Sequence, residues 1–384
     1  MTQSASLAVP RDPRKLFAPL TLLLLLGCGH TEPFGSPPTD NDGPFDPTPP
    51  VRLTLNQGPD RGAAWLPDGS GILYSAQQLG RRDNDVCLAL IPPGGGTQRR
   101  LTCDLTPTGA DSTDALEAPA PFPDGRLAFV AVGSRIDAIT PPGATIVLGD
   151  VTDPANRTPV QPLPYTAPGE RLHSGASQIR WLNSNRLVFL AERVDYHLRC
   201  YICVEWDTIT TGVDIAWLDL TQPGTLPRRV PGTDFASGVS VGASEDEIYY
   251  SLNGDSRVYR QTLSTGAVAV AHDFGAGQAV RDVHVVGNRM AAVVGGRVTY
   301  GIDPTFGPTA WDSGGVLHLV DLQNGGDVVL DPLGLYRRPQ ISPSGSALVA
   351  EGYPLIITDV PDPGGGVRPD TTVDRRGDLY LFGQ

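Results

Sequence analysis

The clearest pattern along the chain is a run of apolar residues, a tight turn of polar residues or glycine, and a second apolar run. It first appears at Ala64 to Ser75, where Pro67-Asp68-Gly69 supplies the turn, and it recurs five times. The recurrences lie at residues 120–131, 179–191, 239–251, 283–294 and 340–351. Two apolar runs around such a turn are typical of a β-hairpin. Because the hairpin repeats, the sequence predicts a repeat fold.

Each of the first five hairpins is followed by two further short runs. In the first unit the four runs are Ala63 to Leu66, Gly71 to Ala76, Asp85 to Ile91 and Gln98 to Cys103, and we name the strands that they predict A, B, C and D. Strand B is apolar on both faces in most units, as in Ile72-Leu73-Tyr74. A strand of this kind is covered on both faces, which favours sheets stacked against one another.

The two ends of the chain complement each other. The sixth unit has strand A near Gln340, strand B at residues 347–351 and strand C at residues 378–382, and no strand D follows. Val51 to Thr54 is similar to Arg99 to Thr102 and can supply the missing strand. Pairing the two ends in this way removes two exposed sheet edges. We therefore predict an all-β domain over residues 51–384: a six-bladed β-propeller of four-stranded antiparallel blades, with the ring closed by an N-terminal strand.

The turn motifs carry a family resemblance. Pro67-Asp68-Gly69 followed by Ile72-Leu73-Tyr74-Ser75, and Pro123-Asp124-Gly125 followed by Leu127-Ala128-Phe129, resemble the WD40-like repeats of TolB-type β-propellers. The resemblance covers all six units, although the Asp-Gly pair is lost in the third to the fifth. It implies periplasmic scaffolding or ligand binding, and no motif here transfers a specific partner.

The N-terminus predicts export. Residues 1–27 carry Arg11, Arg14 and Lys15 before an apolar run from Leu16 to Leu26, which is too short to span a bilayer and is typical of a signal peptide. The run ends in Leu25-Leu26-Gly27-Cys28, which resembles the lipobox of bacterial lipoproteins and implies acylation of Cys28. Gly29 in place of Asp then implies an outer-membrane or surface location. An ordinary signal peptide or a buried apolar segment remains the alternative.

Composition adds a tether and excludes some partners. Residues 28–50 are rich in Pro and Asp, which predicts an extended tether rather than a folded segment. The 45 Gly and 37 Pro residues argue against a mostly helical protein. The net charge of −13 disfavours nucleic acid and anionic lipid surfaces as partners, so the membrane contact is expected through the lipid anchor alone.

The links between strands differ at the two ends of each blade. The A–B and C–D links are tight, whereas the B–C and D–A links include long segments at residues 104–117, 193–212, 295–314 and 352–377. Long loops on a rigid scaffold are where binding usually occurs, so we predict that this end is functional. The predicted binding residues are Asp195, Tyr196, His197, Tyr201, Glu205, Trp206 and Trp311. The alternative is that these side chains form the small core of a long loop.

The cysteines favour disulfides. After Cys28 the chain has four, an even number in an exported protein. Cys87 and Cys103 are expected to face each other across a C–D hairpin, and Cys200 and Cys203 to close a small ring. A zinc site on Cys200, Cys203 and His197 is the less favoured alternative, because no second pair supplies the missing ligands. We therefore expect no metal and no cofactor.

Two function classes remain. The first is a membrane-tethered cell-envelope binding or scaffold protein whose long-loop end engages an envelope protein or glycan, without catalytic residues. The second is a glycan-active hydrolase or lyase of the envelope that uses paired carboxylates from Asp195, Glu205 and Asp207. Two carboxylates facing each other at the channel mouth, one with a pKa shifted by burial, favour the enzyme.

Overall fold

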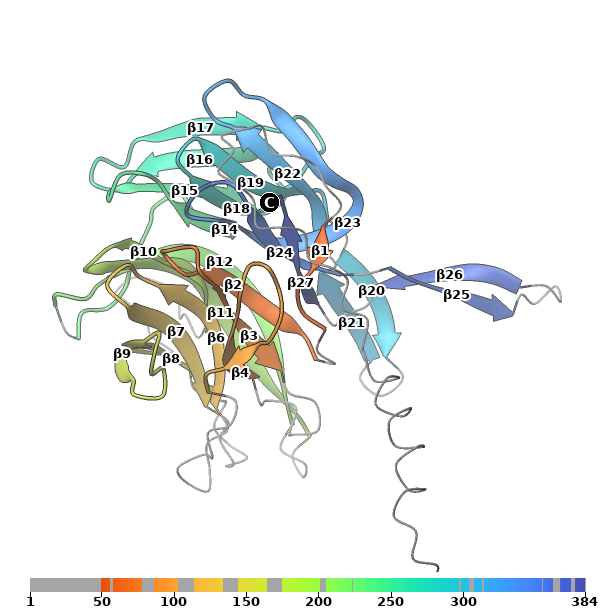
Figure 1. The fold of residues 1–384 in the computed structure, drawn as a ribbon, viewed down its shortest axis with the longest axis horizontal. Helices are drawn as coiled ribbons and strands as arrows, with labels where there is room; N and C mark the ends of the chain where they lie inside the picture. Colours follow the sequence, from red (N-terminus) through yellow and green to blue (C-terminus); the bar gives the residue numbers. More distant parts are fainter. Residues whose placement is uncertain are drawn as a thin grey trace, which may run out of the picture. The chain divides into compact units, whose positions relative to one another are not determined.

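The computed structural model describes residues 50–55, 58–77, 86–102, 114–133, 144–163, 175–200, 205–222, 224–296, 298–303, 307–312, 314–353, 355–361, 367–373 and 377–383 (Figure 1). All regular elements in these ranges are β-strands. Among the described residues, no helix is long and apolar enough to cross a membrane. The predicted signal peptide and nearly all of the predicted tether lie outside these ranges.

Four sheets contain four sequential antiparallel strands each. The first holds β2 (Asp60–Trp65), β3 (Ile72–Gln77), β4 (Val86–Ile91) and β5 (Arg99–Arg100). The second holds β6 (Asp114–Pro121), β7 (Arg126–Gly133), β8 (Ala144–Asp150) and β9 (Thr158–Leu163). The third holds β10 (Gly175–Asn183), β11 (Arg186–Cys200), β12 (Glu205–Asp219) and β13 (Arg228–Arg229). The fourth holds β14 (Ala236–Val241), β15 (Glu247–Leu252), β16 (Arg257–Thr262) and β17 (Val268–Asp273).

A seven-stranded sheet supplies two further units of the same kind. Its order is β1 (Val51–Arg52), β27 (Asp378–Phe382), β24 (Leu348–Gly352), β23 (Asp327–Ile341), β22 (Gly315–Asp321), β19 (Arg289–Val294) and β18 (Val280–Val286). The first half of β23 pairs with β22 and the second half with β24, so one long strand serves two blades. The described strands thus form six blade-like units, which we number 1 to 6 in chain order.

The chain ends meet as predicted. Val51 pairs with Leu381 and Arg52 with Tyr380, so β1 becomes the fourth strand of blade 6. The Arg52 guanidinium lies 2.6 Å from the Asp378 carboxylate, and the Leu379 N–H donates to the Thr54 hydroxyl at 2.9 Å. Without this pairing, one edge of β27 would expose unpaired backbone N–H and C=O groups.

The core lies between the blades, because the B strands are apolar on both faces. Ile72, Leu73 and Tyr74 of β3 are all fully buried, and one cluster joins Trp65 of blade 1 to Val349 of blade 6. Full burial of one such side chain contributes roughly 1.5–3 kcal/mol. Packing between blades therefore holds the last unit to the first.

The A–B turns behave as the sequence predicts. The Gly69 N–H donates to the Leu66 carbonyl at 2.9 Å, and Gly69 has a φ of 74°, a conformation that favours glycine. The Asp68 carboxylate accepts the Ser70 N–H at 3.0 Å. Each of these contacts is local, so the hairpin is specified by a few consecutive residues.

Three links that the sequence predicted as loops are β-hairpins instead. Strands β11 and β12 continue past the blade and pair from Val194 with Thr210 to Cys200 with Glu205. The other two are β20 (Val298–Asp303) with β21 (Gly307–Asp312), and β25 (Leu355–Pro361) with β26 (Val367–Val373). These segments are rich in β-branched residues, which favour extended pairing. All three follow strand B of their blade, so they belong to the same end of it, which we call the B–C end.

Candidate functional site

Strand A, the first strand of every blade, has a β-bulge near the ring centre. The register of β2, β6, β10, β14, β18 and the second half of β23 shifts by one extra residue. In four blades the bulge contains a residue with positive φ: Gly62, Ala118, Gln178 and Arg338. Only glycine adopts this conformation freely, and other residues pay roughly 1 kcal/mol or more. Bulges of this kind re-aim neighbouring side chains.

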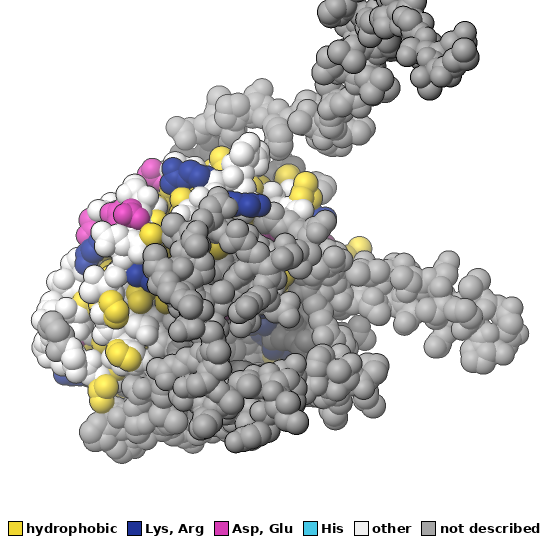
Figure 2. All heavy atoms as spheres, turned by 90° about the horizontal axis from the view of Figure 1, so that it is seen from below, with side chains coloured by type: hydrophobic (Ala, Val, Ile, Leu, Met, Phe, Trp, Pro, Cys, Tyr) yellow, Lys and Arg dark blue, Asp and Glu magenta, His cyan; other side chains and the backbone are white. Residues whose placement is uncertain are grey.

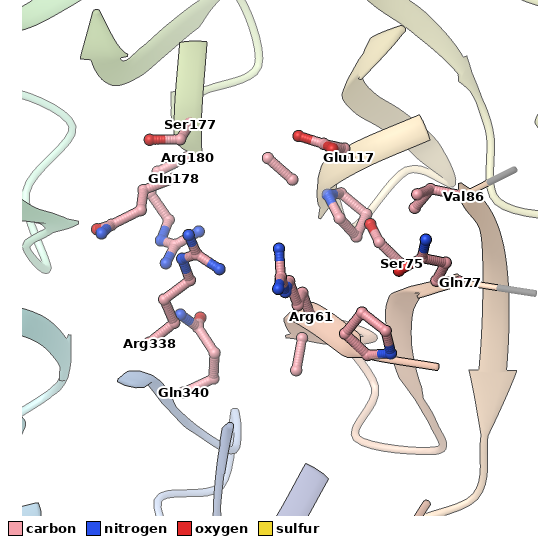
Figure 3. Close-up of a pocket in the computed structure, with 15 residues that line it drawn as sticks. Arg61, Ser75, Gln77, Val86, Glu117, Ser177, Gln178, Arg180, Arg338 and Gln340 are labelled. Carbon is pink, nitrogen blue, oxygen red and sulfur yellow. The ribbon is translucent and has the colours of Figure 1, made fainter. Parts of the chain in front are cut away.

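A cavity of about 110 Å³ lies among these four bulges (Figure 3). Its lining comes from blades 1, 2, 3 and 6: Pro59, Arg61, Gly62, Ala63, Ser75, Gln77, Val86, Glu117, Ala118, Pro119, Ser177, Gln178, Arg180, Arg338 and Gln340. Gln77 and Val86 form the last pair between β3 and β4, next to the B–C link of blade 1. The cavity therefore lies toward the B–C end.

Three guanidinium groups face this cavity. Figure 3 shows Arg61 on one wall and Arg180 with Arg338 on the opposite wall. Arg180 makes one hydrogen bond, from Nη1 to the Ile179 carbonyl at 2.9 Å, and its buried Nε has no partner among the described residues. Burial lowers the pKa of Arg180 to about 10; the negative charge of Asp282 opposes this shift, and the positive charge of Arg338 adds to it. From the viewpoint of Figure 2, basic side chains are visible inside a recess.

Glu351 of strand β24 is a fully buried carboxylate that accepts four hydrogen bonds from three donor groups. It accepts two hydrogen bonds from Arg338 Nη1 at 3.1 and 3.2 Å, one from the Gly62 N–H at 2.7 Å and one from the Tyr353 hydroxyl at 3.0 Å. Burial alone raises its pKa, but Arg338 and the other donors outweigh burial and hold the pKa below its usual value. Glu351 thus neutralises Arg338 and ties blade 6 to blade 1.

Asp282 of strand β18 has the same role on the other side of the ring. Its carboxylate accepts from Arg337 Nε at 2.6 Å, from the Arg338 N–H at 3.1 Å and from Gln178 Nε2 at 2.9 Å. Burial raises the pKa of Asp282, and the two arginines more than offset this, so the pKa lies below its usual value. Blade 5 is therefore joined to blades 3 and 6 through one side chain.

Glu117 is the carboxylate that lines the cavity. Burial raises its pKa, the charges of Arg338 and Arg61 oppose that rise, and the charge of Glu192 adds to it. Glu192 itself accepts a hydrogen bond from the Ser177 hydroxyl. The cavity thus combines guanidinium groups with a carboxyl group that takes up a proton more readily than usual.

His284 lies behind the cavity, between blades 5 and 6. Its Nδ1 accepts the Ile341 N–H at 3.0 Å, so the ring is neutral at that nitrogen. Burial lowers the pKa of His284 to about 3, and the charge of Arg180 lowers it further. This histidine therefore has a structural role at neutral pH.

Comparison with known proteins places the fold. No family model matches the chain, and no curated protein is similar to it in sequence. Among solved structures, it is similar to the gluconolactonase XC5397 of Xanthomonas campestris, with a TM-score of 0.50, 13% identity and coverage of 87% of this chain and 89% of the other. A luciferin-regenerating enzyme gives a TM-score of 0.50, 11% identity and coverage of 88% and 96%. TolB of Acinetobacter baumannii gives 0.42, 14%, 85% and 64%.

The fold is a β-propeller. At these identities the likeness concerns the fold alone. The activities of the neighbours therefore do not decide between the two function classes, and the geometry of this propeller must carry the argument.

The predicted binding residues of the propeller lie on its hairpins. Asp195, Tyr196, His197, Glu205 and Trp206 are in the β11–β12 extension, and Trp311 is in β21. The backbone register places His197 opposite Asp207 and Asp195 opposite Ile209, so no two of the predicted carboxylates Asp195, Glu205 and Asp207 pair directly. Their side chains and Tyr201 lie outside the described part of the structure, so their binding role stays a prediction.

The cysteine predictions are only partly accessible. Cys87 is a disulfide cysteine. The described side chains do not include its partner, so the pairing with Cys103 stays a prediction. The same holds for Cys200 with Cys203 and for lipidation of Cys28. Within the described ranges, no group of three His, Cys, Asp or Glu residues is arranged to hold a metal ion.

Sequence reasoning missed the charged residues at and around the cavity, although a signal for them exists. A charged residue stands six positions before the turn proline in three blades: Arg61 before Pro67, Glu117 before Pro123 and Arg337 before Pro343. A charge at a fixed place in a mostly apolar inner strand indicates a polar channel. Asp282, between Val280 and Val283, is a fourth charge of this kind.

Proposed function

We propose that this protein is a binding or scaffold protein of the bacterial cell envelope, tethered through Cys28, which engages its ligand or partner at the B–C end of the propeller. One observation carries the proposal: the cavity and the three long hairpins belong to the same end of the blades. A concave site with convergent polar groups and projecting hairpins around it is suited to recognition.

The charges around the ring centre favour binding over hydrolysis. Asp282 and Glu351 are held as ion pairs by Arg337 and Arg338, so neither is available as an acid or a base. Glycoside hydrolysis generally requires two carboxylates on either side of the scissile bond. Three guanidinium groups at the cavity are instead suited to holding a negatively charged group.

The test is capture of a partner from native envelopes by the full-length, lipidated chain, with chemical crosslinking. A variant in which residues 355–373 are replaced by a short glycine linker is expected to lose a crosslinked partner that the wild type captures. A control variant carries Asp150→Ala and Asp219→Ala at the opposite end and should capture as the wild type does. Loss in the control together with capture by the hairpin variant contradicts the proposal.

The tether has its own test. Replacing Cys28 by Ser removes the thiol to which a lipid would be attached, so the exported protein should move from the membrane fraction to the soluble fraction. Two hydrophobic chains hold a protein on a membrane far more strongly than the acidic folded domain does. A membrane-bound Cys28→Ser variant contradicts lipid anchoring.

An envelope enzyme acting on glycans is the second candidate, and Glu117 is the observation that favours it. Its raised pKa suits a general acid, and Glu192 is a second carboxylate close enough to affect it. If the protein is a hydrolase or lyase, Glu117→Gln abolishes turnover of an envelope glycan while binding of that glycan persists. The binding proposal expects no turnover by the wild type in the same assay.

A further inference from the structure

Arg61 and Arg180 differ from Arg337 and Arg338, two other arginines near the ring centre. Arg337 and Arg338 each have a carboxylate partner. Among the described residues, the Arg180 side chain makes one hydrogen bond, to a main-chain carbonyl, and Arg61 makes no side-chain hydrogen bond, although its charge acts on Glu117 and Glu351. A guanidinium group has five N–H donors, so most donors of both residues are unused. Arg61 is exposed, whereas Arg180 has a buried Nε, so the cost of an unpaired charge falls mainly on Arg180, and a counter-charge at the cavity would reduce it.

The geometry indicates where that counter-charge lies. Figure 3 shows Arg61 and Arg180 reaching toward the same space from opposite walls, with Arg338 beside Arg180. Arg338 is neutralised by Glu351, but its charge still acts on Arg180 and lowers the pKa of that residue. An oxyanion between Arg61 and Arg180 would relieve the repulsion between guanidinium groups and fill their free donors.

The remaining lining limits the kind of anion. Glu117 faces the same cavity, and its charge, when ionised, repels a second negative charge on the ligand. Ser75, Gln77 and Gln340 add neutral hydroxyl and amide groups to the walls, and the buried Ser75 hydroxyl has no hydrogen-bond partner among the described residues. Groups of this type match ligand hydroxyls. The lining therefore favours a hydroxylated monoanion over a dianion.

We propose that the cavity binds a hydroxylated monocarboxylate, such as a sugar acid, with its carboxylate held between Arg61 and Arg180 and its hydroxyl groups on Glu117 and the neutral polar walls. The proposal deepens the proposed function, because it names the chemistry of a ligand taken up at the B–C end. It does not depend on the identity of a macromolecular partner.

Isothermal titration calorimetry of the full chain tests the proposal with three probes. D-glucuronate carries the carboxylate, D-glucose is its neutral counterpart, and inorganic phosphate is the competing oxyanion. We expect binding of glucuronate and none of glucose at the same concentration. Binding of glucose as tight as that of glucuronate, or binding of phosphate alone, overturns the carboxylate proposal.

Two variants locate the site. Arg61→Gln removes an exposed guanidinium, so it should leave folding intact and weaken glucuronate binding about 10- to 100-fold, the usual effect of losing a charge-assisted hydrogen bond. Arg99→Gln is the matched control, because Arg99 is exposed on the outer strand β5, and its affinity should stay within about twofold of the wild type. Equal affinity of Arg61→Gln and wild type overturns the proposal.

The same variant separates this inference from the proposed function. Arg61→Gln is expected to lose glucuronate while it still crosslinks to the envelope partner through the hairpins. The variant without residues 355–373 is expected to lose the partner and keep glucuronate. If Arg61→Gln still binds glucuronate as the wild type does, the cavity proposal has failed; if the variant without residues 355–373 still captures the partner, the proposed function has failed.

Discussion

The two ends of each blade use the same residue types in opposite ways. At the end of the blade that carries the A–B and C–D links, which we call the turn end, exposed carboxylates accept hydrogen bonds from residues two positions further along. Examples are Asp68 to Ser70, Asp150 to Thr152 and Asp219 to Thr221. Around the ring centre, buried Asp282 and Glu351 bind partners as far as 104 and 289 positions away in the chain. The turn carboxylates organise one hairpin each, whereas the central carboxylates join neighbouring blades.

This difference indicates which contacts keep the propeller ring closed. A solvent-exposed turn carboxylate contributes little to the free energy of unfolding, because solvent screens its charge and replaces its hydrogen bonds. Removing the partner of a buried carboxylate lowers the free energy of unfolding strongly, and so does removing the carboxylate and leaving its buried partner unpaired. We therefore expect closure of the ring to depend on Asp282 and Glu351 and to be nearly independent of the turns.

The largest expected effect is that of Glu351→Gln. The substitution keeps the shape of the side chain and removes the charge that neutralises Arg338, so we expect the free energy of unfolding to fall by about 3–5 kcal/mol. Urea denaturation followed by circular dichroism measures it. Asp219→Asn at the turn end is the matched control. A loss below about 1 kcal/mol for Glu351→Gln breaks the comparison between the two ends.

A double-mutant cycle sharpens the same point. If Arg338 and Glu351 act as a pair, Arg338→Gln combined with Glu351→Gln costs less than the sum of the two single changes, with a coupling of about 0.5–3 kcal/mol. Additive losses contradict a pairwise interaction and assign the effect of Glu351 to its contacts with Gly62 and Tyr353.

The contrast also explains how much of this protein is predictable from sequence. The strands, their order and the pairing of Val51 with Leu381 follow from a local pattern that repeats in every blade. The partners of Asp282 and Glu351 do not repeat, and they are brought together only when the ring closes. The hairpins were missed for another reason: β25 and β26 have the β-branched residues of strands, but they are flanked by proline and glycine, which is typical of loops.

The next prediction is a pH dependence of the free energy of unfolding, which arises from His284 near the ring centre. His284 has a pKa of about 3 in the folded protein and about 6.5 when unfolded, so the unfolded chain binds the proton first and stability falls as the pH drops below about 6.5. Between pH 7 and pH 5 we expect a loss of about 2 kcal/mol. Urea denaturation at both pH values measures it.

His284→Asn provides the control for this pH dependence. Its side-chain oxygen can still accept the Ile341 N–H, but it does not titrate, so the loss between pH 7 and pH 5 should largely disappear. Glu117 acts in the opposite direction, because its raised pKa makes the folded protein take up a proton first as the pH falls. Since Glu117 is present in both proteins, its contribution cancels in the comparison. An unchanged pH dependence in His284→Asn contradicts the assignment.

A smaller effect concerns the bulges. Ala118 has a φ of 51°, the conformation that glycine adopts at the equivalent position 62 of blade 1. Ala118→Gly should relieve this strain and raise the free energy of unfolding by roughly 0.5–1 kcal/mol, after the extra flexibility of glycine in the unfolded chain is taken into account. Gly62→Ala should change stability in the opposite direction. Destabilisation by Ala118→Gly contradicts strain at this bulge.

The smallest effect is expected at the turn end, and it completes the comparison. Asp68→Ala removes an exposed carboxylate whose pKa is lowered chiefly by the Ser70 N–H and hydroxyl. Solvent replaces these hydrogen bonds and Gly69 still closes the turn, so Tm measured by calorimetry should fall by less than about 2 °C. Because the lowered pKa gives its stabilisation only above the ordinary pKa of Asp, even this small loss should vanish as the pH falls through the folded pKa. A decrease in Tm as large as that of Glu351→Gln would mean that the turns, and not the buried carboxylates, hold the ring together.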